Sequence, residues 1–397
     1  MTYREITHGL YWVGANDWDR RLFDELIPLP DGTSYNAYLI RGSKKTALID
    51  TVDPTKETEL LENLRSLGIA SLDYVVVNHA EQDHSGAIPC ILKEFPEAKV
   101  VTNEKCREFL RTLLMLPENV FSVVKDGDTL SLGDRTLEFL ITPWVHWPDT
   151  MLTYLHEDQM LFTCDFFGSH LATSDLYARE RMRVYEAAKR YYAEIMMPFR
   201  VSIKTHLERL KKYEIRILAS SHGPIWDDPQ SIIDAYTGWV SDRVENEVII
   251  VYVSMHGNTK KMVDHLVDGL IRRGIRVKPF NLTVTDVGEL AKSLVDAATI
   301  VIGTPTVISN PHPSAMYATH LTRVLRPKVR YATVVGSYGW GGKTVQVITE
   351  LLSGSSIKFL DPVILKGNPA YEGYAALDVL AETIAQKHEQ DPFVVKG

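Results

Sequence analysis

The sequence predicts an α/β protein of two domains, at residues 1–246 and 247–397. Strand and helix signals alternate regularly in the second part of the chain and irregularly in the first. The chain has 397 residues, and at roughly 150 residues per domain that length favours two or three domains. A composition of 45% hydrophobic and 24% charged residues suffices for two separate cores. We place the boundary in the polar run at 241–246, between an amphipathic helix at 229–240 and an apolar strand.

In the first domain, short strands occur in pairs around turns, with helical patterns between and after them. This arrangement is typical of a mixed β-sheet with intervening helices. The expected strands are 10–13, 35–40, 46–50, 74–77, 129–132, 136–142, 151–154, 160–164 and 215–220. The expected helices are 55–67, 86–94, 103–113, 179–195 and 199–212.

In the second domain, five β-α units follow one another, which predicts a parallel sheet with helices on both faces. Ligands of such sheets bind at the carboxyl ends of the strands, where the chain reverses direction. The expected strands are 248–253, 276–280, 298–303, 332–336 and 358–365. The expected helices are 259–273, 286–294, 314–325, 343–352 and 374–388.

Charge, hydropathy and cysteine content exclude several classes of protein. A net charge of −8 and a pI near 5.9 argue against a nucleic-acid partner. The apolar runs are too short for a membrane span, and the N-terminus does not resemble a signal peptide, so we expect a cytoplasmic protein without a membrane partner. Three cysteines without a C-x-x-C pair exclude a disulfide framework and an all-cysteine iron–sulfur cluster.

Potential metal ligands follow the ends of several predicted strands. Because each strand can present its terminal side chains at the same edge of a sheet, we expect them to converge. The set holds imidazoles and carboxylates but no thiolate, which suits two metals bridged by a carboxylate and favours non-haem iron over structural zinc. Strand alternation places Cys164 on the opposite face, in the core. The candidate ligands are His79, Glu81, Asp83, His84, His146, Asp165 and His222.

Three loops of the second domain, each after a predicted strand, form a candidate cofactor site whose first loop is similar to the phosphate loop of flavodoxins. Hydroxyls, a glycine and backbone N–H groups at a helix N-terminus suit a phosphate, and they occur in the first loop. The motif Gly341-Gly-Lys-Thr344 does not belong to a nucleotide P-loop, because Ser337 occupies the position of the required first glycine. The candidate residues are Ser254, Met255, His256, Gly257, Asn258 and Thr259, then Thr304, Pro305, Thr306 and Val307, then Ser337, Tyr338, Gly339, Trp340 and Gly341.

The pattern His79-x-Glu81-x-Asp83-His84, with single His, Asp and His positions after it, resembles the metallo-β-lactamase fold in its flavodiiron variant. The resemblance implies an αββα sandwich for the first domain and a flavodoxin-like doubly wound sheet for the second. Glu81 stands where hydrolases of that superfamily usually carry His. The resemblance implies that His79, Glu81 and His146 hold one iron, that Asp83, His84 and His222 hold the other, and that Asp165 bridges them. It implies no catalytic residue beyond the diiron ligands.

The same resemblance implies an oxidoreductase that reduces O2 to water, or NO to N2O, with FMN and two non-haem irons. Electrons would come from an external donor, rubredoxin or reduced F420. The working unit would be a head-to-tail homodimer or a dimer of dimers, in which each flavin serves the irons of the other chain. The second loop departs from the family at Ile308, where Asn is frequent.

Three other functions are compatible with the residues. The first is a metal-dependent (zinc) hydrolase fused to a flavodoxin-like electron-transfer domain, against which Glu81 argues. The second is a plain flavin electron carrier with a structural metal domain. The third is an FMN-dependent reductase whose first domain only binds a partner. Metal analysis tests the first function, and O2 or NO consumption by the reduced protein tests the second. Replacement of a metal ligand tests the third.

Overall fold

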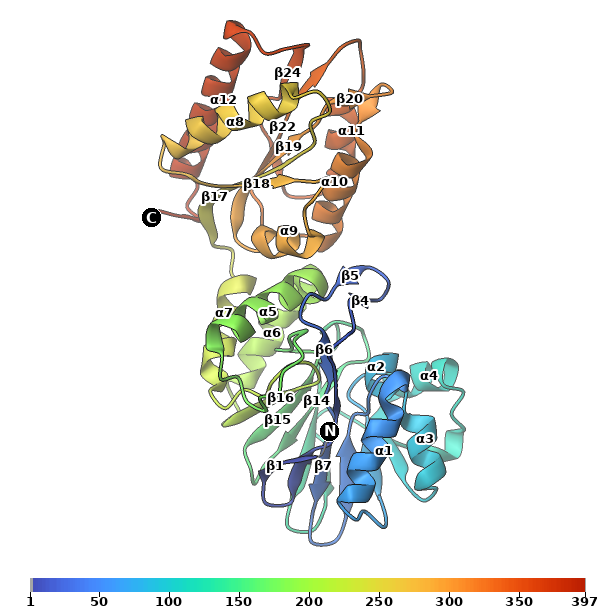
Figure 1. Ribbon diagram of the computed structural model, residues 1–397. Coiled ribbons are helices and arrows are strands. Elements are labelled where there is room, and N and C mark those ends of the chain that lie inside the picture. Colours follow the sequence, from blue (N-terminus) through green and yellow to red (C-terminus); the bar gives the residue numbers. More distant parts are fainter. Residues whose placement is uncertain (1–2, 397) are drawn as a thin grey trace. The chain divides into compact units, whose positions relative to one another are not determined.

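The computed structural model describes residues 3–396 and divides the chain into two compact units, Met1–Val240 and Ser241–Gly397 (Figure 1). Each unit has its own core and is described by itself. Within residues 3–396, no helix has the length and apolarity needed to cross a membrane.

The first unit contains two larger β-sheets that pack face to face. A buried apolar cluster lies between them and includes Ile49 and Val76 of one sheet and Phe139 and Phe162 of the other. One sheet has the order β1 (Arg4–Thr7), β2 (Leu10–Trp12), β7 (Tyr38–Arg41), β8 (Thr46–Ile49), β9 (Tyr74–Val76), β10 (Lys99–Asn103) and β11 (Phe121–Val124). The other has the order β12 (Thr129–Ser131), β13 (Thr136–Ile141), β14 (Met151–Leu155), β15 (Met160–Cys164) and β16 (Ile217–Ser220).

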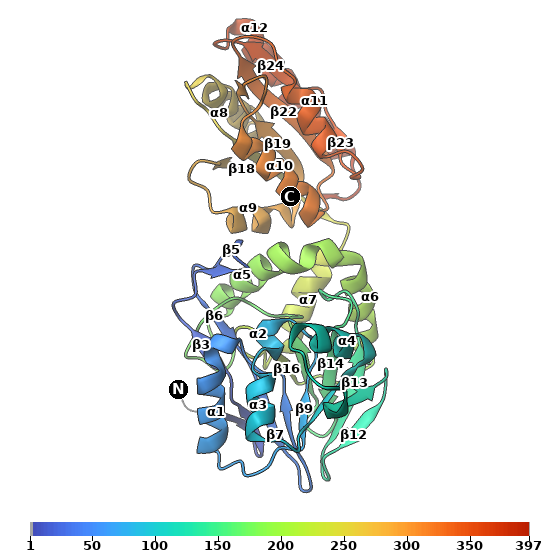
Figure 2. The same ribbon diagram turned by 90° about the vertical axis from the view of Figure 1, so that its right-hand side faces the viewer.

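Helices cover the outer sides of this pair of sheets. α1 (Glu57–Ser66), α3 (Ile88–Glu94) and α4 (Glu104–Leu113) lie side by side over the first sheet (Figure 2). Leu60, Ile91 and Leu110 of these helices pack in one cluster with Leu39 and Val75 of the sheet. On the other side lie α5 (Arg181–Tyr191), α6 (Arg200–Leu210) and α7 (Pro229–Val240). The layers are those of an αββα sandwich, which confirms the fold predicted for this part of the chain.

The second unit is a parallel sheet covered by helices. Its strand order is β18 (Arg276–Asn281), β17 (Val244–Tyr252), β19 (Ala297–Gly303), β22 (Tyr331–Tyr338) and β23 (Lys358–Phe359). The chain reverses its direction of winding between β17 and β19, where a doubly wound sheet binds its ligand. The helices are α8 (Asn258–Ile271), α9 (Val287–Leu294), α10 (Pro313–Leu325), α11 (Thr344–Leu351) and α12 (Tyr371–Gln390). This is the predicted flavodoxin-like fold.

Two segments of the second unit differ from the expected elements. The stretch 241–246, expected as a linker, already contains the start of β17 at Val244. Val244 pairs there with β25 (Val394–Val395), a strand contact that the local sequence does not reveal. The single strand expected at 358–365 is divided into β23 and β24 (Val363–Lys366), because Pro362 lacks the N–H that a continuous ladder needs.

His388 on α12 predicts how the stability of the second unit depends on pH. The side chain is buried, with Nε2 2.7 Å from Thr299 Oγ1 and Nδ1 2.8 Å from Asn246 Oδ1. Burial lowers the pKa of His388 from 6.5 to about 4. Below pH 6.5 the unfolded chain therefore binds a proton that the folded chain does not, so the free energy of unfolding falls as the pH is lowered towards about 4 and is then constant.

The loss attributable to His388 should reach about 3 kcal/mol, from roughly 1.4 kcal/mol for each unit of pKa difference. Thermal unfolding measured between pH 7.5 and 4 gives the stability at each pH. Stability should decline less over this range in His388→Gln than in the wild-type protein. Equal declines in the two proteins would show that His388 is not the group responsible.

Candidate metal centre and flavin site

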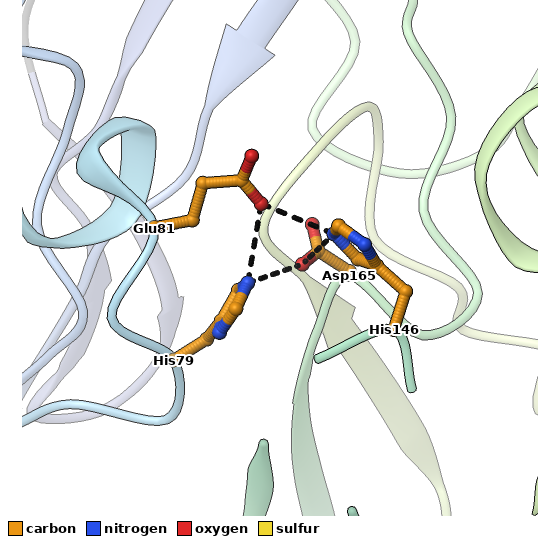
Figure 3. Close-up of side chains that lie close together, drawn as sticks. All are labelled: His79, Glu81, His146 and Asp165. Carbon is orange, nitrogen blue, oxygen red and sulfur yellow. Dashed lines mark hydrogen bonds and ion pairs between the residues drawn. The ribbon is translucent and has the colours of Figure 1, made fainter. Parts of the chain in front are cut away.

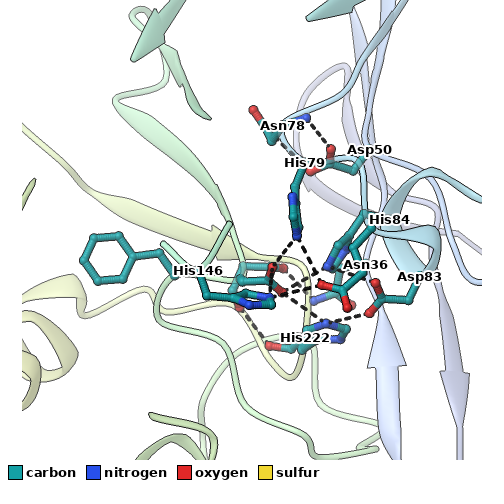
Figure 4. Close-up of polar contacts among 12 residues, drawn as sticks. Asn36, Asp50, Asn78, His79, Asp83, His84, His146 and His222 are labelled. Carbon is teal, nitrogen blue, oxygen red and sulfur yellow. Dashed lines mark hydrogen bonds and ion pairs between the residues drawn. The ribbon is translucent and has the colours of Figure 1, made fainter. Parts of the chain in front are cut away.

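The seven candidate ligands come together at one end of the two sheets of the first unit (Figures 3 and 4). They come from separate segments, each of which follows a strand. His79 and Glu81 follow β9, His146 lies between β13 and β14, Asp165 follows β15 directly, and His222 follows β16. Asp83 and His84 lie on the short helix α2 (Gln82–Ser85), where the sequence predicted a loop. The predicted convergence is therefore present in the fold.

Four of these side chains form a first group, His79, Glu81, His146 and Asp165, with ligand atoms within 4.8 Å of one another (Figure 3). Glu81 Oε2 lies 3.1 Å from both His79 Nε2 and His146 Nε2. Asp165 Oδ2 lies 3.8 Å from His79 Nε2 and 3.5 Å from His146 Nε2. Two imidazoles and two carboxylates thus surround one point.

The other three form a second group, Asp83, His84 and His222 (Figure 4). Asp83 places Oδ1 3.3 Å from His84 Nε2 and Oδ2 3.1 Å from His222 Nε2. The second oxygen of Asp165, Oδ1, lies 3.0 Å from His84 Nε2 and 3.4 Å from His222 Nε2. Asp165 therefore presents one oxygen to each group, which is the arrangement of a carboxylate between two metal ions.

The buried carboxylates lack sufficient partners within the protein. Both oxygens of Asp83 and Oδ2 of Asp165 are buried without a hydrogen bond, since their contacts with the imidazoles do not have hydrogen-bond geometry. A buried carboxylate without a partner is costly, and a bound cation removes that cost. Together with a donor set of only imidazole nitrogen and carboxylate oxygen, these oxygens fit two cations such as iron.

The electrostatics of the cluster agree with a cation site. Burial alone would raise the pKa of Asp165, but His84, His146 and His222 hold it well below its usual range. Burial lowers the pKa of His146, yet its contacts with Asp165 and Glu81 outweigh burial and raise that pKa to about 9. The carboxylates thus retain protons on the neighbouring histidines, and a metal ion would take the place of those protons.

Hydrogen bonds outside the cluster orient two of the rings. His79 Nδ1 lies 3.1 Å from Asp149 Oδ2, which also accepts a 2.8 Å bond from the Ala80 N–H. His222 Nδ1 lies 2.7 Å from the Ser34 carbonyl oxygen, which can only accept. Both rings therefore carry hydrogen on Nδ1 and direct the lone pair of Nε2 into the cluster.

The sequence alone does not indicate that Asp149 and Ser34 orient ligand rings. Asp149 had a local signal, a carboxylate three residues after His146, although nothing in the sequence connects it with His79. Ser34 had none, because its contribution is a backbone carbonyl that any residue could supply.

Asp149→Asn should lower the affinity of the first group for iron by about 10- to 100-fold, the effect of losing a group that supports a ligand. The substitution keeps the shape of the side chain but removes the charge that stabilises the Nδ1–H form of His79. Anaerobic titration with Fe²⁺ measures the change, with the exposed Gln82→Ala as a control. An unchanged affinity in Asp149→Asn would contradict the role of Asp149.

Cys164 lies closer to the cluster than strand alternation predicted. Its sulfur is within 4.8 Å of ligand atoms of His84 and Asp165, while the side chain remains buried. The reason is a shift in register between β15 and β16 at Phe162 and Cys164, where Cys164 has a positive φ of 50°. Such a bulge rotates the side chains that follow it, which sequence periodicity does not show.

In the second unit, the loops after β17, β19 and β22 surround a cavity of about 250 Å³. Thr259 is buried in the first turn of α8, with Oγ1 3.4 Å from Ser337 Oγ, and Gly257 starts the helix with a φ of 85°. The cavity therefore includes the N-terminus of a 14-residue helix, where N–H groups without intrahelical partners favour an anion.

Most of the predicted flavin residues line this cavity, namely Ser254, Met255, His256, Asn258, Thr259, Pro305, Thr306, Ser337, Tyr338 and Gly339. Gly367, which the sequence did not indicate, lines it as well. The remaining predicted residues, Gly257, Thr304, Val307, Trp340 and Gly341, do not. Thr304 is fully buried, and its Oγ1 accepts a 3.0 Å bond from the His312 N–H, so it stabilises the loop from within.

The chain is similar to known proteins over most of its length. A family model described as ODP family beta lactamase matches residues 33–223. The chain is 39% identical to a nitric oxide reductase of Moorella thermoacetica, over 89% of this chain and 90% of that one. It is 37% identical to a coenzyme F420H(2) oxidase of Methanothermobacter marburgensis, over 88% and 90%.

Its fold superposes on that of a solved rubredoxin oxygen:oxidoreductase from Desulfovibrio gigas, with a TM-score of 0.93 and 29% identity, over 97% of this chain and 98% of that one. These similarities extend over both units. The chain belongs to the flavodiiron proteins and is an oxidoreductase.

Proposed function

We propose that this protein reduces O2 to water, NO to N2O, or both, with electrons from an external donor. FMN and two non-haem irons are its cofactors. The observation that carries the proposal is the position of Asp165, which presents one oxygen to each of two groups of imidazoles and carboxylates. Two irons held by these residues would supply open coordination positions for a small diatomic and the electrons to reduce it.

The protein's own residues position the metals and shield the site. His79, Glu81 and His146 would hold one iron, Asp83, His84 and His222 the other, and Asp165 would join them. All but Glu81 and His146 are almost fully buried, so bulk water is kept from most of the cluster. Glu81 supports iron over a hydrolytic zinc site, because it adds a second carboxylate to a site that already holds two imidazoles.

The loops after β17, β19 and β22 would hold FMN, which supplies storage for two electrons. Ser254 and Thr259 would bind the phosphate at the N-terminus of α8, and Tyr338 lies in the cavity where a flat ring system could pack. Cys90, Cys106 and Cys164 form no disulfide, and the described residues contain no cysteine cluster that could act as a built-in electron donor. We infer rubredoxin or reduced F420 as the external donor from the names of a similar F420H(2) oxidase and a similar rubredoxin oxygen:oxidoreductase, and the free thiols support a cytoplasmic location.

The function is tested by mixing the reduced protein with O2 and, separately, with NO, using rubredoxin and reduced F420 in turn as donors. Consumption of at least one gas with at least one donor is the expected result. A protein that accepts electrons into the flavin but consumes neither gas would be an electron carrier, and the proposal would be wrong.

We also propose that the working unit is a head-to-tail dimer in which each flavin serves the irons of the other chain. Only residues 241–243 separate α7 from β17, and three residues reach at most about 10 Å, which restricts the rotation of one unit towards the other. Residues 1–240 hold 36 Asp and Glu and 26 Lys and Arg, a net charge of −10. Residues 241–397 hold 15 Asp and Glu and 17 Lys and Arg, a net charge of +2. This difference in charge favours contact between unlike units of two chains.

Complementation tests the crossed arrangement. Asp83→Asn, which lacks a working metal site, is mixed with Thr259→Leu, which binds FMN poorly. Transfer between chains leaves one intact pair in each heterodimer, so activity should return after subunit exchange. If exchange is demonstrated and no activity returns, electrons pass within one chain and the crossed arrangement is wrong.

A further inference from the structure

A group of aromatic side chains begins at the metal cluster and extends to the surface of the first unit. Its inner end is Tyr191, the last residue of α5, which is 1% exposed. The Tyr191 hydroxyl donates a 2.7 Å hydrogen bond to Asp165 Oδ1. A five-residue π-helical turn follows at Tyr192–Met196, and such turns are frequent at functional sites.

The next members of the group are Tyr192 and two residues of α7. The ring of Tyr192 is 5.3 Å from that of Tyr236 and 5.2 Å from that of Trp239. The rings of Tyr236 and Trp239 are 5.0 Å apart, one helical turn from each other. The outer member is Tyr185 of α5, which is half-buried and 5.5 Å from Trp239. Each member thus contacts the next by its ring or, for Tyr191 and Tyr192, adjoins it in the chain.

Phe166 and Phe167 connect the same aromatic residues to Asp165 from a second direction. They follow Asp165 in the chain and stack on each other at 3.8 Å. Their rings lie 5.3 and 4.9 Å from that of Tyr236. The group is therefore continuous by two routes.

Packing alone does not account for the residue types along this group. The Tyr236 hydroxyl is buried without a hydrogen-bond partner, which costs free energy that a phenylalanine would avoid. Phenol and indole side chains can be oxidised reversibly by one electron. They occur at the inner end of the group (Tyr191), in its middle (Tyr236 and Trp239) and at its outer end (Tyr185). Oxidisable side chains that follow one another from a redox site to solvent, in ring contact or adjacent in the chain, form a path for single electrons.

We propose that this aromatic group carries electrons inward from reductants in solution and so protects the metal site from oxidative damage. The proposal rests on the proposed function, because it requires O2 reduction at the cluster. Reduction of O2 to two waters consumes four electrons, two more than the flavin can store. If the reaction started before enough electrons had arrived, the metal site would remain oxidising. The side chains exposed to it would include Asp165 and the buried imidazoles of His84 and His222.

The path is balanced in electrons and protons. Tyr191 would give one electron to the site, and its phenolic proton would shift within the hydrogen bond towards Asp165 Oδ1 without leaving that bond. Trp239 returns an electron to Tyr191 by way of Tyr192 and Tyr236, and the proton moves back. Tyr185 then reduces Trp239, releasing a proton to water, and a solution thiol or ascorbate restores Tyr185 with one electron and one proton. The net result is one electron carried inward, with every O–H bond re-formed.

The test compares the wild-type holoprotein with Tyr191→Phe and Trp239→Phe. Tyr154→Phe is the matched control, because Tyr154 is also a buried tyrosine of this unit but pairs with Tyr213, outside the group. Each protein receives two electron equivalents per chain and is then mixed with excess O2. Freeze-quenched samples are examined for tyrosyl and tryptophanyl radicals, and oxidised residues are mapped by peptide mass spectrometry.

In the wild-type protein and in Tyr154→Phe we expect a radical signal, with oxidation products at Trp239 and Tyr185. In Tyr191→Phe and Trp239→Phe the product at Tyr185 should be lost, oxidation should move to His84 and His222, and iron should be lost over fewer turnovers. If either variant fails to fold, Tyr185→Phe replaces the half-buried outer member of the group. In that variant Trp239 should be the outermost residue that carries an oxidation product. Identical oxidation maps in all the proteins would overturn the proposed path. A wild-type protein that consumes NO but not O2 would also overturn the proposed path while the proposed function stands, whereas one that consumes neither gas would refute the proposed function.

Discussion

Asp83→Asn should bind at most one iron per chain and lose turnover by more than about 100-fold, while FMN remains bound. This loss of turnover exceeds the roughly 10- to 100-fold effect of removing a group that only supports a metal ligand. Asp83 places one oxygen 3.3 Å from His84 Nε2 and the other 3.1 Å from His222 Nε2, so the second group has no carboxylate of its own without it. The flavin loops belong to a separate compact unit and should be unaffected.

The measurement is iron content, flavin content and turnover on one preparation of Asp83→Asn. The control is Gln82→Ala, an exposed position on the same helical turn, which should behave as the wild-type protein. Depleted iron with normal turnover in Asp83→Asn would end the diiron hypothesis.

Thr259→Leu should lower the affinity for FMN by roughly 10- to 100-fold, because charge-assisted hydrogen bonds to a phosphate contribute about 1.5–3 kcal/mol each. Thr259 is buried at the N-terminus of α8, and its hydroxyl lies 3.4 Å from that of Ser337. Leucine removes the hydroxyl and adds bulk to the same cavity.

Flavin titration followed by fluorescence measures this change. Thr259→Ser retains the hydroxyl and should bind FMN nearly as the wild-type protein does. Equal affinities in Thr259→Leu and the wild-type protein would place the phosphate elsewhere in the unit.

The candidate metal site could be predicted from the sequence because its residues follow the ends of strands that are apolar and easily recognised. The strands before His79, Asp165 and His222 are β9, β15 and β16, and each was expected within a few residues of its observed bounds. Parallel or adjacent strands that end together bring such side chains to one edge. The doubly wound second unit was predictable for a similar reason, its regular alternation of strand and helix.

The features that were missed depend on contacts distant in sequence. β10 and β11 were not expected, because each is short and is defined by pairing with a neighbour rather than by its own pattern. Asp149 supports His79 across 70 residues of sequence, and Tyr191 reaches Asp165 from another helix. The bulge at Cys164 and the start of β17 at Val244 likewise arise from strand partners.

The diiron and FMN content of this protein, and its dependence on iron for activity, are tested most directly by measuring iron, zinc and FMN together with O2 and NO turnover on one preparation of the wild-type protein. We expect two irons and one FMN per chain, with turnover proportional to iron content as iron is removed by chelation and restored. A zinc-loaded protein that is active as a hydrolase, or full gas turnover in the absence of iron, would contradict this expectation.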